Sequence, residues 1–268
     1  MLGFKRKQNE RRNLIMHTAF LMLLIGLFAG TMGAILGIGG GMIITPIITL
    51  GMGLPIKYAI GASIIAVIAT SSGSTIAFLK DDVLNLRVAM FLELATSIGA
   101  IVGALLTGVF NPAILYFLFG CLLLFASWNM VRKLRSGKEV LHRATPDKLA
   151  EKLKLNNSYY DKNLHEQVDY EVENVPGGMT IMFGAGLASG LLGIGSGAFK
   201  VMALDNVMKM PLKPSSATSN LMMGVTAAAS ATIYFFNGSI RPDIAAPLSL
   251  GIIVGAALGS LIMEHMPS

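Results

Sequence analysis

The stretch Gly33-Ala-Ile-Leu-Gly37-Ile-Gly39-Gly40-Gly41-Met-Ile-Ile-Thr-Pro46 places a glycine cluster inside an apolar run, where a membrane-spanning helix would be uninterrupted. Glycine lets the backbone leave a helix and approach a ligand without a Cβ in the way. In the bilayer interior, backbone groups released from a helix must be surrounded by protein or by a water-filled cavity. The stretch therefore predicts a broken helix whose interruption lies inside the protein.

The same pattern occurs a second time at one constant offset. Leu36-Gly37-Ile38-Gly39 aligns with Leu192-Gly193-Ile194-Gly195. Without a gap, the alignment also pairs Gly41 with Gly197, Pro55 with Pro211, Ser63 with Ser219, Thr70 with Thr226, Gly99 with Gly255 and Gly103 with Gly259. An internal duplication is the simplest explanation. Interrupted hydrophobic segments at matching places in two halves indicate a transporter whose binding site lies near the membrane midplane.

The composition predicts a multi-pass membrane protein. The 268 residues are 53% hydrophobic and only 13% charged, which is too apolar for an ordinary soluble domain. The net charge of +6 does not indicate nucleic-acid binding, because the basic residues gather in the first dozen residues and in the central loop, as in cytoplasmic flanks. Cys121 is the single cysteine and forms no intrachain disulfide. We expect a lipid bilayer around the chain.

Two all-α repeats of about four helices each are expected. The apolar run from Leu14 to Leu36 is long enough to span a bilayer, and we read it as an uncleaved first helix rather than a signal peptide. The segment Met42 to Leu50 is too short to cross and predicts a half-helix that dips in and returns. Further helices are expected at Tyr58–Leu79, Val88–Phe110, Pro112–Val131, Met179–Leu192, Ser215–Phe236 and Ile244–Met263, with a second short segment ending at Leu204.

The chain divides into an N-terminal membrane repeat (1–131), a polar insert (132–178) and a C-terminal membrane repeat (179–268). The insert is basic at its start and acidic toward its end, so we expect a cytoplasmic segment, either a small ordered cap or a flexible linker. The counterpart of Pro112 is Ser268, so the last helix of the second repeat is expected to be missing. Either the chain is a truncated form or the fold manages with seven helices.

The orientation of the repeats follows from the positions of the basic residues. If the N-terminus and the insert are both cytoplasmic, an even number of crossings separates them, and four helices per half satisfies this. We therefore expect parallel repeats related by an axis along the membrane normal. The alternative is that Met42 to Leu50 crosses fully, which would invert the repeats and place the basic head outside.

The chain resembles the TauE/SafE sulfite exporter family at Gly37-Ile-Gly39-Gly40-Gly41 with Pro46, at Gly61-Ala62-Ser63, and at Thr70-Ser71-Ser72. It does so again at Gly193-Ile-Gly195-Ser196-Gly197 and Ala217-Thr218-Ser219. The resemblance covers nearly the whole chain outside the insert, although Met202 stands where the first half has Pro46. It implies a secondary transporter of sulfur-containing anions in a bacterial cell membrane. The family is broad and does not fix the substrate.

The two glycine clusters are the candidate substrate site. Packing alone does not require so many glycines, and freed amides at the start of a half-helix suit an anion. Hydroxyl and amide side chains near the breaks are expected to line the same site. The candidate substrate-binding residues are Gly37, Gly39, Gly40, Gly41, Ser63, Gly193, Gly195, Ser196, Gly197, Lys200, Ser219 and Asn220. We read Gly99-xxx-Gly103 and Gly255-xxx-Gly259 as helix packing points instead.

Two charged residues fall within expected helices, where a charge is costly and needs a partner or a role. Lys200 replaces Ile44 of the first half, and it either neutralises a bound anion or pairs with Asp205 or reaches the surface. Glu93 has Ser249 as its counterpart. It is either a coupling carboxylate or an interfacial acid near Arg87.

The function expected from these residues is secondary transport of a small anion, ion-coupled and by alternating access. The alternatives are a channel and an assembly or regulatory subunit that binds a partner through the insert. An enzyme is not expected, because neither HExxH nor GxSxG occurs in the sequence. We expect no cofactor and no metal site. The sequence leaves open whether the chain forms a homo-oligomer.

Overall fold

The computed structural model describes residues 2–36, 39–80, 83–136, 147–161 and 165–265. Its membrane part is all-α, as expected. The first half contains α1 (Leu2–Leu36), α2 (Gly41–Pro46) with the π-helical η1 (Ile47–Gly51), α3 (Ile56–Lys80), α4 (Leu86–Thr107) and α5 (Pro112–Ser136). The second half contains α7 (Val175–Leu192), α8 (Gly197–Met202) with the π-helical η2 (Ala203–Val207), α9 (Leu212–Phe236) and α10 (Pro242–His265). Between the halves lie α6 (Lys148–Lys152), β1 (Asn157–Asp161) and β2 (Glu166–Tyr170).

Six helices in the described part of the chain are long and apolar enough to cross a membrane. These are α1, α3, α4, α5, α7 and α10. The remaining long helix, α9, carries buried Ser, Thr and Asn side chains among its apolar residues. It lies inside the bundle, where protein rather than lipid surrounds those polar groups.

Glycines bring two pairs of helices, α4 with α7 and α1 with α10, into backbone contact. A Cβ on Gly99 or Gly103 would clash with the carbonyl oxygens of Phe183 and Leu187 on α7. In the same way, Gly255 meets Leu27 of α1. The expectation that both GxxxG pairs are packing points is confirmed. In each half, the first helix therefore packs against a helix of the other half.

The helix directions show that the repeats are inverted, so the expected parallel orientation is wrong. At the centre, Ser71 of α3 meets Gly224 of α9, and Phe78 packs with Ala217, so these equivalent helices run antiparallel. Repeats related by an axis along the membrane normal would make them parallel. The axis that relates the halves therefore lies in the membrane plane.

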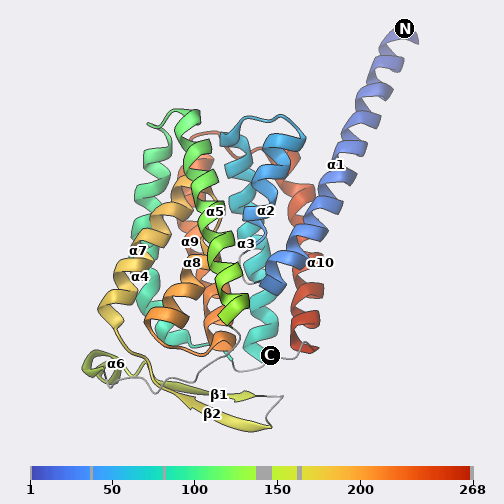
Figure 1. The fold of residues 1–268 in the computed structure, drawn as a ribbon. Coiled ribbons are helices and arrows are strands. Elements are labelled where there is room, and N and C mark those ends of the chain that lie inside the picture. Colours follow the sequence, from blue (N-terminus) through green and yellow to red (C-terminus); the bar gives the residue numbers. More distant parts are fainter. Residues whose placement is uncertain (1, 37–38, 81–82, 137–146, 162–164, 266–268) are drawn as a thin grey trace.

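The physical reason is that the chain does not cross the bundle between the start of α1 and the start of α3. Gly26 and Gly30 meet Leu248 and Ile252 of α10 in turn. Gly61 meets Ser239, just before α10, and Gly73 meets Ala256 within it, so α1 and α3 both run parallel to α10. The chain must therefore turn back through α2 and η1 before α3 begins. Only α3, α4 and α5 then cross between the start of the chain and the insert, an odd number. Figure 1 shows the start of α1 at one end of the bundle and β1 and β2 at the other, so the two do not share one side.

The insert is an ordered cap on one end of the bundle rather than a flexible linker over its described residues. Asn85, just before α4, donates its side-chain amide to the Leu155 carbonyl (2.8 Å) and to the Tyr170 hydroxyl (3.1 Å). Burial raises the pKa of Tyr170 to about 12, so the phenol stays neutral and accepts this bond. Asp147 caps α6 and also accepts from the amide of Val175 at the start of α7 (3.0 Å).

Replacing a contact glycine should destabilise the bundle. In Gly190→Ala, the new Cβ would clash with the Ala100 carbonyl, and overpacking of this kind costs about 1–3 kcal/mol. Gly184→Ala on the same helix is the control, because open space surrounds its Cβ. We expect a lower thermal unfolding temperature in detergent for Gly190→Ala and an unchanged one for Gly184→Ala. Equal melting temperatures for the two variants would contradict the close packing.

Candidate functional site

The first helix break joins α1 to α2. Gly37 lies outside the described residues, as does Ile38. Gly39 has a positive φ of 74°, which favours glycine, and its amide donates to the Gly33 carbonyl (3.3 Å). Gly40 is the N-cap residue of α2 and offers no side chain to the first amides. A Cβ on Gly40 would lie 3.2 Å from the Thr70 hydroxyl, so α3 packs directly on the break.

The second break joins α7 to α8, and three of the four residues from Gly193 to Ser196 have left-handed backbone conformations. Gly193 (φ 66°) ends α7, Gly195 has φ 72°, and Ser196 has φ 48° although it carries a side chain. Non-glycine residues in this region are strained and gather at functional sites. All three residues are buried, as is Gly197 at the start of α8.

The two breaks meet in the middle of the bundle. A Cβ on Gly41 would lie 3.1 Å from the Gly193 carbonyl oxygen, and the Ser63 hydroxyl donates to that same oxygen (2.6 Å). The buried side chains of Val67 and Met223 pack at the contact, next to Gly39 and Gly195. In this conformation the glycine segments of the two halves are therefore in direct contact.

Three carbonyl groups at the end of α7, those of Gly190, Leu191 and Gly193, accept hydrogen bonds from side chains of other helices. The Tyr234 hydroxyl donates to the Gly190 carbonyl (2.6 Å), and the Thr107 hydroxyl reaches the Leu191 carbonyl (3.1 Å). Ser63 satisfies Gly193. A helix end leaves its last carbonyls without partners, and in a membrane that is costly. Side chains from α3, α4 and α9 thus close the acceptor end of the break.

The donor end of the second break is left open. Ser196 occupies the N-cap position of α8 but its side chain makes no capping bond. Over the described residues, the Ser196 Oγ is fully buried without a hydrogen-bond partner, and so is the Asn220 Oδ1 on the facing helix α9. Ser219 donates to the Gly197 carbonyl (3.2 Å) and supports the start of α8. The start of α8 therefore presents the Ser196 hydroxyl without a protein acceptor, and the Asn220 Oδ1 without a protein donor, over the described residues.

A charged cluster lies one helical turn beyond this break. Lys200 on α8 is fully buried and donates to the Met222 carbonyl (2.9 Å) and to the Thr226 hydroxyl. Its Nζ is 3.8 Å from the Glu93 Oε2 on α4. The other carboxylate oxygen of Glu93 accepts from Thr226 (2.6 Å) and from Ser97 (2.9 Å). The cluster joins α4, α8 and α9.

The structure thus unites most of the expected site residues but changes two assignments. Lys200 does not reach the surface, and its described counter-charge is Glu93 rather than Asp205. Glu93 is not an interfacial acid, because it is buried and faces α8 and α9.

Three partner residues were not predicted: Ser97, Thr107 and Tyr234. Thr226 was visible in the sequence only as the repeat counterpart of Thr70.

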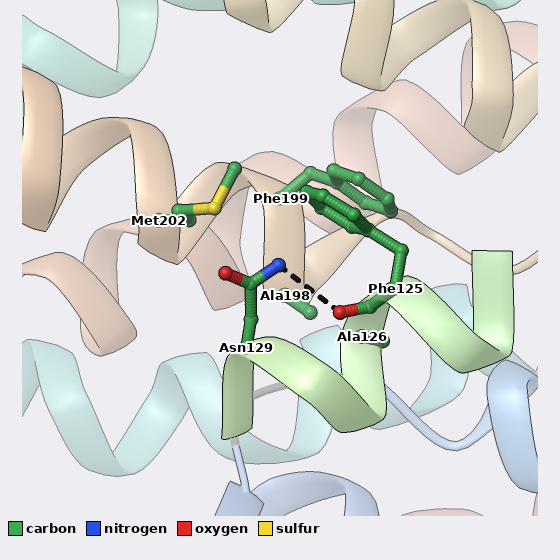
Figure 2. A pocket seen from close by; sticks show the side chains of 6 residues that line it. All are labelled: Phe125, Ala126, Asn129, Ala198, Phe199 and Met202. Atoms are coloured by element: carbon green, nitrogen blue, oxygen red, sulfur yellow. Dashed lines mark hydrogen bonds between the residues drawn. The ribbon is translucent and has the colours of Figure 1, made fainter. Parts of the chain in front are cut away.

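The site contains nothing that resembles a metal centre. In the described ranges, no group of three or more His, Cys, Asp or Glu side chains comes together. Figure 2 shows a separate small pocket between α5 and α8, where the rings of Phe125 and Phe199 stack at 5.3 Å. The Asn129 side chain there donates to the Phe125 carbonyl (3.0 Å). This lining is almost entirely apolar and does not suit an anion.

Comparison with known proteins gives one family and several relatives. The family model described as sulfite exporter TauE/SafE matches residues 22–268. The probable membrane transporter protein YunE of Bacillus subtilis is 25% identical over 92% of this chain and 89% of its own length. The probable membrane transporter protein MJ0441 of Methanocaldococcus jannaschii is 24% identical over 92% of this chain and 86% of its own length. No solved structure gives a significant match.

The charged cluster predicts a coupled effect on stability. Glu93→Gln leaves Lys200 buried without a counter-charge, and Lys200→Met does the same to Glu93. Removing one partner of a buried pair costs about 3–5 kcal/mol, whereas removing both costs much less. Each single variant should therefore lower the melting temperature in detergent, and the double variant should lower it by less than the sum of the two. Additive effects would show that the two side chains do not interact.

Proposed function

The chain belongs to the sulfite exporter TauE/SafE family, and from this premise we propose that it is a secondary transporter of small sulfur-containing anions. The observation that carries the proposal is that the two ends of the second helix break differ in their hydrogen bonding. Side-chain donors bond to carbonyl groups at the end of α7, whereas Ser196, the buried N-cap residue of α8, makes no capping hydrogen bond. Free amides at a helix start, with the helix dipole behind them, favour a negative charge.

Lys200 adds a positive charge to the same region. It lies in the first turn of α8, and its amide donates to the Ser196 carbonyl (3.1 Å). Helical side chains lean toward the N-terminus of their helix, which here is the break. A sulfite, thiosulfate or sulfonate group has several acceptor oxygens for the amides, for the Ser196 hydroxyl and for an ammonium group. The expected substrate-binding residues Gly39, Gly40 and Gly41 would form the opposite wall.

Alternating access is the mechanism that the fold supports best. Inverted repeats with broken helices at the midplane are typical of secondary transporters. The contact between Gly41 and Gly193 and the packing of Val67 and Met223 close the centre in this conformation. An anion would enter when the halves separate on one side, and the same movement inverted would open the other side. A static channel would need an opening past these buried side chains.

The protein has multiple membrane-crossing helices, and we place it in the bacterial cell membrane with the insert in the cytoplasm. The basic head of α1 and the insert lie at opposite ends of the bundle, so only one of them is cytoplasmic. The end where α1 begins has Lys5, Arg6, Lys7, Arg11, Arg12, Lys57 and Arg241. The basic residues at the insert end include Lys80, Arg87, Arg132, Lys133, Arg135, Lys148, Lys152, Lys154, Lys209 and Lys213. This larger basic group favours the cytoplasm for that end. The start of α1 then lies outside, contrary to the sequence-based expectation.

Flux measurements in proteoliposomes test the function. The purified protein should move sulfite, thiosulfate or ethanesulfonate faster than acetate, and empty liposomes give the background. If acetate moves as fast as the sulfur anions, the substrate class is wrong. If none of the four moves above the background, the protein is not an anion transporter of this kind.

Gly195→Ala tests whether the break itself carries transport. The substitution forces a side chain into a left-handed backbone (φ 72°), with its Cβ 2.7 Å from Val67. Gly53→Ala is the matched control, because Gly53 also has a positive φ (65°) but has open space around it. We expect at least tenfold slower flux for Gly195→Ala, about 1.4 kcal/mol in the barrier. Equal flux in two variants that both elute as folded protein would contradict a role for the break.

A further inference from the structure

The two oxygens of the Glu93 carboxylate have different surroundings. Oε1 accepts hydrogen bonds from Thr226 (2.6 Å) and Ser97 (2.9 Å). Oε2 is buried and, over the described residues, has no hydrogen-bond partner. It lies 3.8 Å from the Lys200 Nζ, beyond hydrogen-bond distance. Oε2 is therefore held by charge alone and is the oxygen on which a proton would sit.

Lys200 has a donor to spare. An ammonium group has three N–H donors. Its described acceptors are the Met222 carbonyl and the Thr226 hydroxyl, and both lie on α9. The third N–H can serve Glu93 or an incoming anion. One fully buried cation therefore faces two candidate anions, of which only the carboxylate is part of the protein.

Charge balance links the two anions. With Lys200 and Glu93 both ionised, the cluster is neutral. An anion that enters beside Lys200 gives the cluster one uncompensated negative charge, and burying such a charge is very costly. Protonation of Glu93 restores neutrality, because the neutral acid keeps its bonds from Thr226 and Ser97 through Oε1 and carries the proton on Oε2.

We propose that Lys200 exchanges the Glu93 carboxylate for the transported anion, and that Glu93 takes up one proton from the aqueous phase in the same step. The anion and the proton then cross together, and both leave when the pair re-forms. This inference rests on the proposed function and adds its coupling ion and the two residues that carry the coupling. No covalent bond forms or breaks apart from the bond between Glu93 and the proton.

Lys200 is the charged group that faces Glu93 from the packed helices. The α7 helix contains no titratable residue. On α4, Arg87 is exposed and donates to the Lys154 carbonyl, and on α9 Tyr234 donates to the Gly190 carbonyl. Asp205 of η2 lies five residues beyond Lys200, and Lys213 opens the first turn of α9, nine residues before Met222. The proton-dependent change is therefore assigned to Glu93.

Simultaneous recording of anion and proton movement tests the exchange. Proteoliposomes hold a pH-sensitive dye, and the external probe is ethanesulfonate, which does not titrate near neutral pH. We expect wild-type protein to carry protons inward with ethanesulfonate. An inside-alkaline gradient of one pH unit should give about tenfold accumulation, because a monovalent anion and a proton move together without net charge.

Glu93→Gln separates coupling from transport. The glutamine can keep a bond with Thr226 but cannot exchange a proton, so ethanesulfonate should still move, without a dye response and without accumulation by the pH gradient. Glu166→Gln, on the exposed strand β2, is the control and should match the wild type. Wild-type flux without a dye response, or a Glu93→Gln variant that still carries protons, would overturn the exchange while leaving the proposed function intact. No wild-type flux of ethanesulfonate or thiosulfate would overturn the proposed function, and this inference with it.

Discussion

The structure depends on one constraint: two helices stop inside the membrane, and the backbone groups they release must find partners where there is no water. The end of α7 meets this constraint with hydroxyl donors from three other helices, Ser63, Thr107 and Tyr234. This explains why Ser63 of α3 and Tyr234 of α9 carry buried hydroxyl groups at this depth of the bundle. The donors that begin α8 are not closed in this way. The same constraint that shapes the fold therefore leaves an anion-binding surface.

The inverted arrangement follows from how the broken helices are held. The α1 helix packs against α10 and the α7 helix packs against α4, in each case a helix of the opposite half, and glycine allows the backbones to touch. This exchange ties the halves together at their outer pairs, while α3 and α9 cross antiparallel at the centre. Movement at the central contact can then open the site without separating the outer pairs. The two halves differ in charge at Lys200 and Glu93, whose counterparts are Ile44 and Ser249.

The sequence predicted the repeat, the positions of both breaks and the long helices, most of whose ends lie within a few residues of those expected, because these features follow from glycine clusters and apolar runs. It did not predict the direction of the repeats. A sequence alignment reads the same whether the second copy is parallel or inverted, and the number of crossings depended on whether α1 delivers the chain to the far side. The sequence also did not predict the partner of Lys200, because Glu93 is distant in sequence and its repeat counterpart, Ser249, is not acidic. The sequence does not decide whether the insert is a cap or a linker, because the hydrogen bond between Asn85 and Tyr170 joins residues that are far apart in the chain.

The most direct measurement is anion protection of a cysteine placed at the open end of the second break. The variant Ser196→Cys would be made in a chain whose only other cysteine, the exposed Cys121, is replaced by alanine. Its rate of labelling by N-ethylmaleimide would be measured with ethanesulfonate and with the uncharged dimethyl sulfone. A bound anion at these amides predicts labelling slowed several-fold by ethanesulfonate alone. Equal rates with both solutes would show that the break does not hold the anion.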